Sequence, residues 1–337
     1  MIPAAHPQSS DGPGRRFSRR GFLAAAAVPL VAGLAVRGSS AVRGSSGART
    51  ATPRVFFGLD VPDNEADQVD QVAAMVGEQP SVVSLFLKLD SSVPTARLEQ
   101  MASAGQTAFV TLEPWSLASS RGQVDQPQYS LASIIDGDHD VALRAIASKL
   151  GALRRPFYLR FAHEMNAWWY PWCEAVNGNR SGQYVDAWRH VHRVVSQETS
   201  VPIRWVWSPN RLLTSSHYKL PTLKELFPGR DMVDVMGMTG YSHDDPSPVV
   251  TFGSTVDELE YLSSLPLVLS EIGAEGASRA SWLGQLPSFL RADPRIQGFV
   301  YFETSPATTG ASGDYEIATS PSSVSAFKEM LRSVRAI

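Results

Sequence analysis

Residues 157–164 read Phe-Tyr-Leu-Arg-Phe-Ala-His-Glu, an apolar and aromatic run that ends in a charged pair. A short run of this composition predicts a buried β-strand. Comparable runs recur along the chain from residue 54 onward and alternate with amphipathic stretches. The predicted strands are Val55–Asp60, Val82–Lys88, Thr107–Leu112, Phe157–His163, Ile203–Ser208, Val233–Thr239, Leu267–Glu271 and Gly298–Glu303.

The amphipathic stretches predict one helix after each strand. These helices are Glu65–Val76, Thr95–Ala104, Val141–Leu153, Ser181–Ser196, Leu223–Leu226, Val256–Ser263, Ser281–Leu290 and Ser322–Val334. Eight strand–helix units in about 280 residues have the size and rhythm of an α/β (β/α)8 TIM barrel. A doubly wound open sheet is the alternative, but it usually carries a glycine-rich phosphate loop after its first strand. Residues 58–62, Gly-Leu-Asp-Val-Pro, do not form such a loop.

The composition narrows the classes of partner. Hydrophobic residues make up 43% of the 337-residue chain and charged residues 19%, an ordinary balance for a soluble globular protein. Seven arginines lie in residues 1–49, so the remainder holds 23 basic and 32 acidic residues, a net charge of −9. An acidic body is a poor partner for nucleic acid and is compatible with an uncharged substrate. Cys173 is the one cysteine, which excludes an intrachain disulfide.

Residues 1–49 are predicted to be a twin-arginine signal peptide and linker, and residues 50–337 the barrel. Ser18–Leu23 reads Ser-Arg-Arg-Gly-Phe-Leu and precedes an apolar run, Leu23–Val36, that is short for a membrane span. Small residues follow, and cleavage after Ala41 or Ala48 would suit them. We therefore expect a secreted protein without stable membrane insertion after export. An uncleaved signal anchor at the outer face of the membrane is the alternative.

Two glutamates end apolar strands on the face where such barrels hold their active sites. Glu164 ends the fourth predicted strand, and Glu271 ends the seventh, Leu-Val-Leu-Ser-Glu. A retaining glycosidase needs one carboxylate to attack the anomeric carbon and one carboxyl group to protonate the leaving oxygen. The apolar wall after Glu164 would raise its pKa, which suits an acid. The pattern therefore predicts Glu164 as acid/base and Glu271 as nucleophile.

Aromatic residues follow Glu164 at once, in the run Ala-Trp-Trp-Tyr-Pro-Trp at 167–172. Exposed aromatic faces stack on sugar rings, and Trp169 is the predicted platform. Trp168 and Trp172 could equally pack a helix against the barrel. Strand alternation places Arg160, Ala162 and Glu164 on one face, so Arg160 is expected to orient the Glu164 carboxylate.

The sequence predicts no metal site and no cofactor. His163-Glu164 does not begin a zinc-protease motif, because position 167 is alanine where that motif needs histidine. The remaining histidines are scattered along the chain without the spacing of metal ligands. A metal-dependent hydrolase on the same fold remains an alternative that chelation would test.

The fourth-strand segment resembles glycoside hydrolase family 26, whose members show His-Glu-Met-Asn-Gly-x-Trp-Tyr-Pro-Trp; here Ala167 replaces the glycine. The similarity extends from about Val55 to the C-terminus. It includes Thr-Leu-Glu-Pro-Trp at 111–115, Val-Trp-Ser-Pro-Asn at 206–210 and Ser-Glu-Ile-Gly at 270–273. The resemblance implies that Glu164 is the acid/base and Glu271 the nucleophile. The further substrate-binding residues that we expect are His163, Trp169, Tyr241, Glu113, Trp115, Arg160, Tyr301 and Glu303.

Two positions depart from the family. Thr239 stands where an aspartate is common, and Glu303 where an asparagine is usual. We expect both to border the sugar beside the scissile bond and to change which hydroxyl is recognised; alternatively, Glu303 points away and pairs with an arginine. The resemblance implies an endo-β-1,4-mannanase that acts on a polysaccharide, and we expect the protein to be secreted and monomeric. Mixed-linkage β-glucan and β-xylan are alternative substrates, and a non-catalytic carbohydrate-binding barrel is the alternative of a different class.

Overall fold

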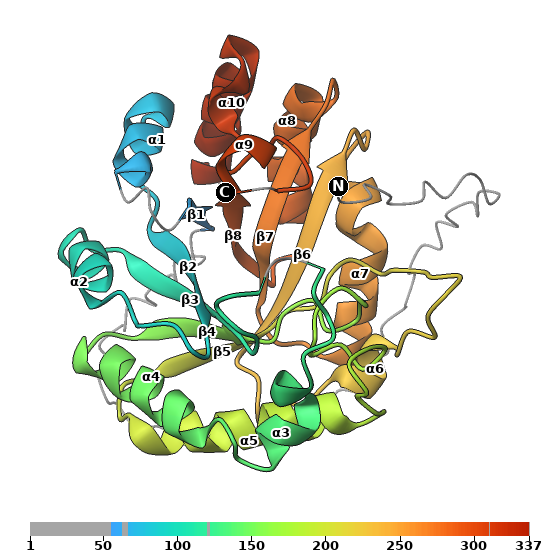
Figure 1. Cartoon of the computed structure of the whole chain (residues 1–337). Coiled ribbons are helices and arrows are strands. Elements are labelled where there is room, and N and C mark those ends of the chain that lie inside the picture. Colours follow the sequence, from blue (N-terminus) through green and yellow to red (C-terminus); the bar gives the residue numbers. More distant parts are fainter. Residues whose placement is uncertain (1–54, 63–66, 120–121, 310, 337) are drawn as a thin grey trace, which may run out of the picture. The chain divides into compact units, whose positions relative to one another are not determined.

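Eight parallel strands form a closed barrel in which each strand pairs with the next and β8 pairs with β1 (Figure 1). This computed structural model describes residues 55–62, 67–119, 122–309 and 311–336. The strands are β1 Phe56–Asp60, β2 Val82–Lys88, β3 Thr107–Glu113, β4 Phe157–Phe161, β5 Ile203–Trp207, β6 Val235–His243, β7 Leu267–Glu275 and β8 Ile296–Phe302. The predicted TIM barrel is confirmed.

Helices connect the strands and lie outside the barrel (Figure 1). They are α1 Gln68–Val76, α2 Thr95–Ser103, α3 Leu131–Ile135, α4 Asp140–Ala152, α5 Gln183–Glu198, α6 Leu223–Leu226, α7 Pro248–Leu262, α8 Arg279–Ala292, α9 Pro306–Thr309 and α10 Pro321–Arg335. Two 3₁₀ turns, η1 Pro127–Tyr129 and η2 Ile317–Thr319, precede α3 and α10. The short elements α3, α9, η1 and η2 were not predicted.

Helix α7 begins eight residues before its predicted start. Ser247 caps the helix by accepting a hydrogen bond from the Val250 N–H, and Pro248 occupies the first turn. Both are standard start signals, since the serine side chain satisfies an orphan N–H and proline needs no donor there. The prediction started at Val256 because the apolar periodicity becomes clear only from that residue.

The core has two layers that follow the alternation of the strands. One side of each strand points into the barrel, where an aromatic and valine cluster fills the lumen; its members are Val82, Phe109, Tyr158, Val206, Val235, Val268 and Val300, with Phe56 packed on them. The other side packs against the helices, as Leu269 and Phe299 do. Burial of such side chains stabilises the fold by about 1.5–3 kcal/mol each. Gly298 is required beside Phe56, because a Cβ there would lie 2.4 Å from the Phe56 ring.

Residues Pro53–Ile337 form one compact unit. The predicted signal peptide and linker at 1–49 lie outside the described residues and stay a prediction. Within the described part of the chain, none of the helices is long and apolar enough to cross a membrane.

Candidate active site

Glu271 is turned into the barrel by an irregularity in β7. Met238 on β6 pairs with Leu269, but the next residue, Thr239, pairs with Glu271, so Ser270 is an extra residue on β7. Ser270 points inward and bonds the hydroxyl of Ser208 at 2.7 Å. Strict alternation would then send Glu271 outward toward the helices. The bulge re-aims its side chain to the inner face, as bulges next to active sites do.

Two donors hold the Glu271 carboxylate. Arg160 Nη2 donates to Oε2 at 2.5 Å, and the Tyr241 hydroxyl donates to Oε1 in a short hydrogen bond. Arg160 is fully buried and also donates from Nε to the Thr111 hydroxyl at 2.9 Å and from Nη1 to the Thr239 hydroxyl at 3.4 Å. The guanidinium and the phenol therefore fix the orientation of the Glu271 carboxylate, which is what a nucleophile requires.

Arg160 therefore orients a different carboxylate from the one expected. The prediction assigned it to Glu164 through strand alternation, but β4 ends at Phe161. The backbone beyond that point enters the left-handed region at Ala162, with φ +46°, and again at Glu164, with φ +55°. Alternation does not apply to such a turn, so the Glu164 side chain departs from the direction of Arg160.

Glu164 is held by contacts made on both sides of this turn. Its N–H donates to the carbonyl of Ser208, which follows β5, at 2.8 Å. The indole N–H of Trp169 donates to Glu164 Oε2 at 2.8 Å. Non-glycine residues with positive φ cost about 1–3 kcal/mol each and cluster at functional sites, where surrounding contacts maintain them. The strained turn thus places a buried carboxyl group, 5% exposed, beside an indole.

Glu164 and Glu271 belong to one electrostatic cluster. Burial raises the pKa of Tyr241 well above its usual value, and the charge of Glu271, then that of Glu164, raises it further. Tyr241 therefore stays a neutral donor throughout the physiological range. The two carboxyl groups therefore lie near one phenol, and a double-displacement glycosidase uses two such groups, one on each side of the scissile bond.

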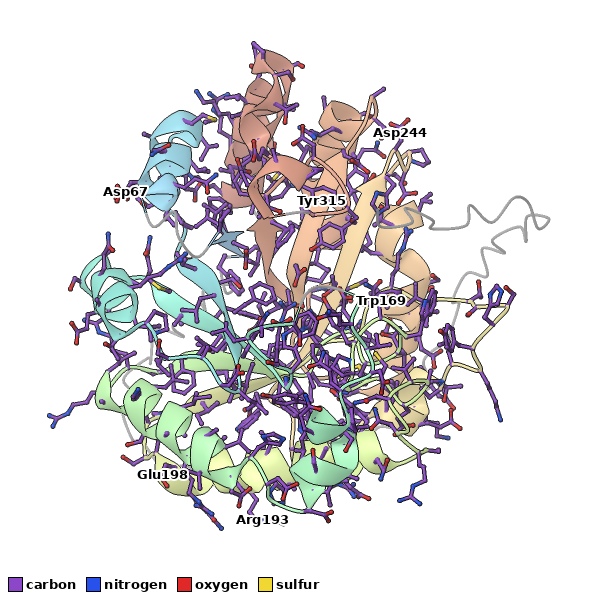
Figure 2. The ribbon with its side chains drawn as sticks, viewed as in Figure 1. Asp67, Trp169, Arg193, Glu198, Asp244 and Tyr315 are labelled. Carbon is purple, nitrogen blue, oxygen red and sulfur yellow. The ribbon has the colours of Figure 1, made fainter. Side chains whose placement is uncertain are left out.

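The aromatic residues after Glu164 have different roles. Trp169 is half-buried, binds Glu164 and meets Trp168 edge-on at 5.0 Å (Figure 2). Trp168 stacks on Tyr218, with centroids 5.8 Å apart. Trp172 is fully buried and donates its indole N–H to the His163 carbonyl at 2.7 Å. For Trp172 the packing interpretation therefore holds, whereas Trp168 and Trp169 are only partly buried.

His163 sits in an aromatic box behind Glu164. Its ring lies 5.0 Å from that of Tyr170, 5.8 Å from that of Phe86 and 5.8 Å from that of Trp172. The side chain is 1% exposed. His163 thus supports the walls of the site and offers little surface to a substrate.

Glu113 and Trp115 lie at the end of β3, beside a cavity of about 240 Å³. The Trp115 indole N–H donates to Glu113 Oε2 at 3.0 Å, and the Lys88 ammonium lies 4.7 Å above the Trp115 ring. Glu113, Lys88 and Phe86 line the cavity. Trp115 is 6% exposed and Lys88 covers one face of its indole, so this ring offers little surface on which a sugar could stack.

Three of the expected substrate contacts are directed elsewhere. Tyr301 is fully buried on the outer face of β8, where it packs on Phe327, because alternation turns it away from the lumen. Thr239 is fully buried and accepts a hydrogen bond from Arg160. Glu303 is 2% exposed, and both of its oxygens accept from the Ile317 N–H at 2.9 Å. Glu303 therefore points away from the site, as the alternative interpretation held, although it binds a backbone N–H and not an arginine.

The sequence profile of glycosyl hydrolase family 26 matches residues 121–260, the stretch that carries Glu164, Trp169 and Tyr241. The chain belongs to glycosyl hydrolase family 26. Hydrolysis in this family retains the anomeric configuration. Glu271 lies beyond the matched stretch, and its place in the site rests on its contacts with Arg160 and Tyr241.

Curated relatives of this family 26 chain are distant. Endoglucanase H of Acetivibrio thermocellus is 21% identical over 293 residues, which cover 77% of this chain and 30% of that protein. Beta-1,3-xylanase TXYA of a Vibrio species is 22% identical over 182 residues, covering 54% of this chain and 37% of that protein. This chain therefore spans about a third of the length of these relatives.

Solved structures show the same fold. A GH26 beta-mannanase from Bacteroides ovatus superposes with a TM-score of 0.62 at 17% identity, covering 84% of this chain and 90% of that one. At this identity the likeness concerns the barrel alone. The substrate of this family 26 member has to be inferred from its own site.

Tyr315 is the residue of this family 26 site that sequence reasoning missed. Its ring lies 4.7 Å from that of Tyr241. Tyr315 (labelled in Figure 2) comes from a loop, thirteen residues after the end of β8. No strand end or motif marks it.

Among the residues that the structure describes, no group of three or more His, Cys, Asp or Glu side chains could hold a metal ion.

Proposed function

We propose that this chain is an exported, endo-acting β-glycanase that cleaves β-1,4-mannan through a covalent intermediate on Glu271. The observation that carries the proposal is the contrast between two carboxyl groups that share one neighbour, Tyr241. Glu271 is held by Arg160 and Tyr241, whereas Glu164 has the neutral indole N–H of Trp169 on its carboxyl oxygen. The first environment suits a nucleophile and the second suits an acid/base.

The reaction takes two steps. Glu271 attacks the anomeric carbon while Glu164 gives its proton to the leaving oxygen, which forms a glycosyl ester and frees the aglycone. Glu164 then takes a proton from water, which attacks the same carbon and releases Glu271. Arg160 holds one oxygen of Glu271 before attack, and Tyr241 stays protonated and holds the other. Trp169 fixes the orientation of Glu164 in both steps.

Mannan is proposed because the fourth-strand motif resembles that of mannan-cleaving members and because the Bacteroides ovatus beta-mannanase shares the barrel. A β-glucan or β-xylan is the second candidate, favoured by the endoglucanase and beta-1,3-xylanase among the curated relatives. Thr239 stands where an aspartate is common in the family, and its hydroxyl accepts a hydrogen bond from Arg160. This replacement supports a substrate preference that differs from that of ordinary mannanases, with Arg160 as the residue through which it acts.

Secretion is also proposed. It rests on Ser18–Leu23 and on the apolar run after it, and a polysaccharide substrate is consistent with an extracellular site of action. Cell fractionation decides between release and anchoring. Protein in the medium that lacks residues 1–41 or 1–48 supports export with cleavage, and full-length protein in the membrane fraction supports the signal anchor.

A polysaccharide panel tests the activity. Glucomannan, galactomannan, mixed-linkage glucan, β-1,3-xylan, β-1,4-xylan and cellulose are each incubated with the wild type, Glu164→Ala and Glu271→Ala, and released reducing ends are measured. The proposal expects mannans to rank first and both variants to lose activity. A glucan or xylan ranked first replaces the substrate. Binding without any released ends identifies a carbohydrate-binding barrel instead.

A further inference from the structure

The ring of Tyr241 is held between two other aromatic rings. Tyr315 lies 4.7 Å away at an interplanar angle of 31°, and Phe302 lies 5.5 Å away at 68°. The Tyr241 hydroxyl donates to Glu271. The position of Tyr315 therefore sets the direction in which Tyr241 presents its hydroxyl to the nucleophile.

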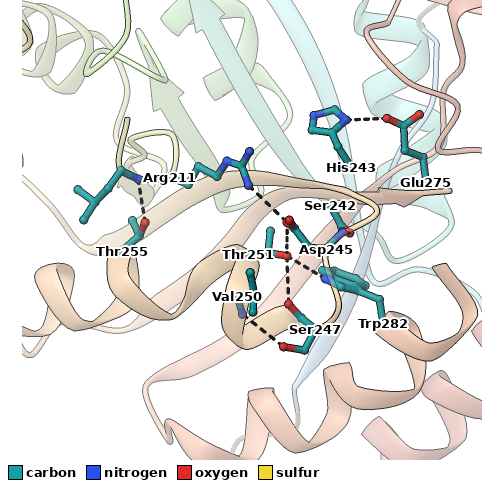
Figure 3. Close-up of polar contacts among 11 residues, drawn as sticks. Arg211, Ser242, His243, Asp245, Ser247, Val250, Thr251, Thr255, Glu275 and Trp282 are labelled. Atoms are coloured by element: carbon teal, nitrogen blue, oxygen red, sulfur yellow. Dashed lines mark hydrogen bonds and ion pairs between the residues drawn. The ribbon is translucent and has the colours of Figure 1, made fainter. Parts of the chain in front are cut away.

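The backbone of Tyr315 is fixed at both polar groups. Its N–H donates to the Thr304 carbonyl at 2.9 Å, and its carbonyl accepts from the Tyr301 hydroxyl at 2.9 Å. The preceding N–H, of Asp314, donates to Glu275 Oε2 at 3.1 Å. Glu275 in turn binds His243 across the tips of β7 and β6 at 2.6 Å (Figure 3). The loop is thus attached to β8 on one side and to β7 on the other.

Glu303 attaches the far end of this loop. Both of its carboxyl oxygens accept from the Ile317 N–H at 2.9 Å, two residues after Tyr315. Arg279, on α8, donates to the Glu316 carbonyl at 2.9 Å and also to that of Asp314. The two side chains therefore fix the backbone on either side of the tyrosine, but Glu303 does so from the end of β8 itself.

A buried carboxyl group at position 303 costs free energy, because burial removes it from water. An apolar side chain would pack there without this desolvation. Burial raises the pKa of Glu303 to about 8, and the charges of Glu316 and Asp314 add to this. The Ile317 N–H and the Arg279 guanidinium oppose the shift. A buried polar group that costs free energy, in a core whose other residues suit the fold, indicates a functional constraint.

We propose that Glu303 is a positioning residue, which holds the loop through Ile317 so that Tyr315 presses Tyr241 into its hydrogen bond with Glu271. The inference rests on the proposed function, since it names Glu271 as the group that is positioned. Glu303 touches neither the nucleophile nor the substrate in this account. It acts through two aromatic rings and one backbone amide.

The test compares Glu303→Leu, which removes the acceptor, with Glu303→Gln, which keeps a carbonyl oxygen for Ile317. Glu316→Gln is the matched control, because it removes a carboxylate from the same loop without touching the Ile317 N–H. With Glu303→Leu, kcat should fall roughly tenfold with little change in KM, the size expected for one lost hydrogen bond. Glu303→Gln should recover most of this loss, and Glu303→Leu combined with Tyr241→Phe should be no slower than Tyr241→Phe alone.

A second readout does not need activity. In protein labelled at tyrosine Cζ with ¹³C, the Tyr241 signal is assigned by its loss in Tyr241→Phe, and its shift reports the hydrogen bond to Glu271. Glu303→Leu should move this signal toward its position in Glu271→Gln, and Glu316→Gln should not. If Glu303→Leu does not fold, Glu303→Asp, which withdraws the acceptor by one methylene, replaces it.

An unmoved Tyr241 signal overturns the proposal, whatever happens to kcat. A moved signal with an unchanged kcat per folded molecule also overturns it. A wild type that cleaves no polysaccharide refutes the proposed function instead. In that case the Tyr241 signal alone decides whether Glu303 positions the ring.

Discussion

Replacing Arg160 with methionine removes the buried charge that Glu271 faces. Arg160 is 0% exposed and makes hydrogen bonds to Thr111, to Thr239 and, at 2.5 Å, to Glu271. Methionine preserves most of the volume of the side chain stem but offers no donor. Glu271 would then keep the hydrogen bond from Tyr241.

The magnitude follows from the burial of both partners. Breaking one side of a buried ion pair costs about 3–5 kcal/mol, because the remaining charge is left without compensation. Removing both partners together costs far less, since no buried charge then remains. We therefore expect Arg160→Met and Glu271→Gln each to lower the free energy of unfolding by a few kcal/mol. The double variant should be more stable than the sum of the two changes by at least about 2 kcal/mol.

Urea unfolding of the four proteins measures this coupling, and it requires no substrate. Arg160→Lys is the matched control, because it keeps the charge but loses the fork that reaches Thr111 and Glu271 together. It should lie between the wild type and Arg160→Met. Strictly additive effects in the double-mutant cycle would refute the view that Arg160 and Glu271 form one buried unit.

Three further predictions concern single groups. Glu164→Ala should lose activity on polysaccharides yet still release the aglycone from activated aryl glycosides, whose leaving groups need no proton. Azide should partly restore turnover of this variant. Equal loss of activity on both substrate types would discard the role of Glu164 as the acid. Because the pKa of Glu303 is about 8 when folded and near 4.5 when unfolded, the native state holds the proton more tightly between these values. The free energy of unfolding should therefore fall as pH rises from about 4.5 to 8, and urea titrations of Glu303→Gln should lack that slope; a wild type with a flat profile would contradict this. Burial raises the pKa of Cys173 to about 12, so the native protein should resist alkylation by iodoacetamide at pH 8 and react once unfolded. Rapid modification of the native protein would contradict this, because it would show that the thiol is accessible.

The fold followed from the sequence because each strand–helix unit carries its own local pattern. Apolar runs gave strands such as Val82–Lys88 with their observed bounds. The predicted strand ends were less accurate where polar or glycine residues continue the pairing of two strands. β6 extends to His243 and β7 to Glu275, past Gly240 and Gly273, which resemble turn residues in the sequence but lie within paired strands.

The site depends on deviations from regular structure, which no periodic rule predicts. The direction of Glu271 depends on the extra residue Ser270, and that of Glu164 on two backbone angles in the left-handed region. Tyr315 reaches Tyr241 through a loop whose course is set by contacts far apart in sequence. The sequence could name the reactive carboxylates from residue type and strand order, but tertiary contacts decide which neighbour orients each one.

Trapping the covalent intermediate tests the central claim most directly. The wild type is incubated with an activated 2-deoxy-2-fluoro glycoside of the sugar that ranks first on the polysaccharide panel, which slows release of the glycosyl enzyme more than its formation. Peptide mass spectrometry then locates the added sugar. We predict one sugar per chain, on Glu271, which the structure places between Arg160 and Tyr241. A sugar attached to Glu164, or inactivation without any attached sugar, would contradict it.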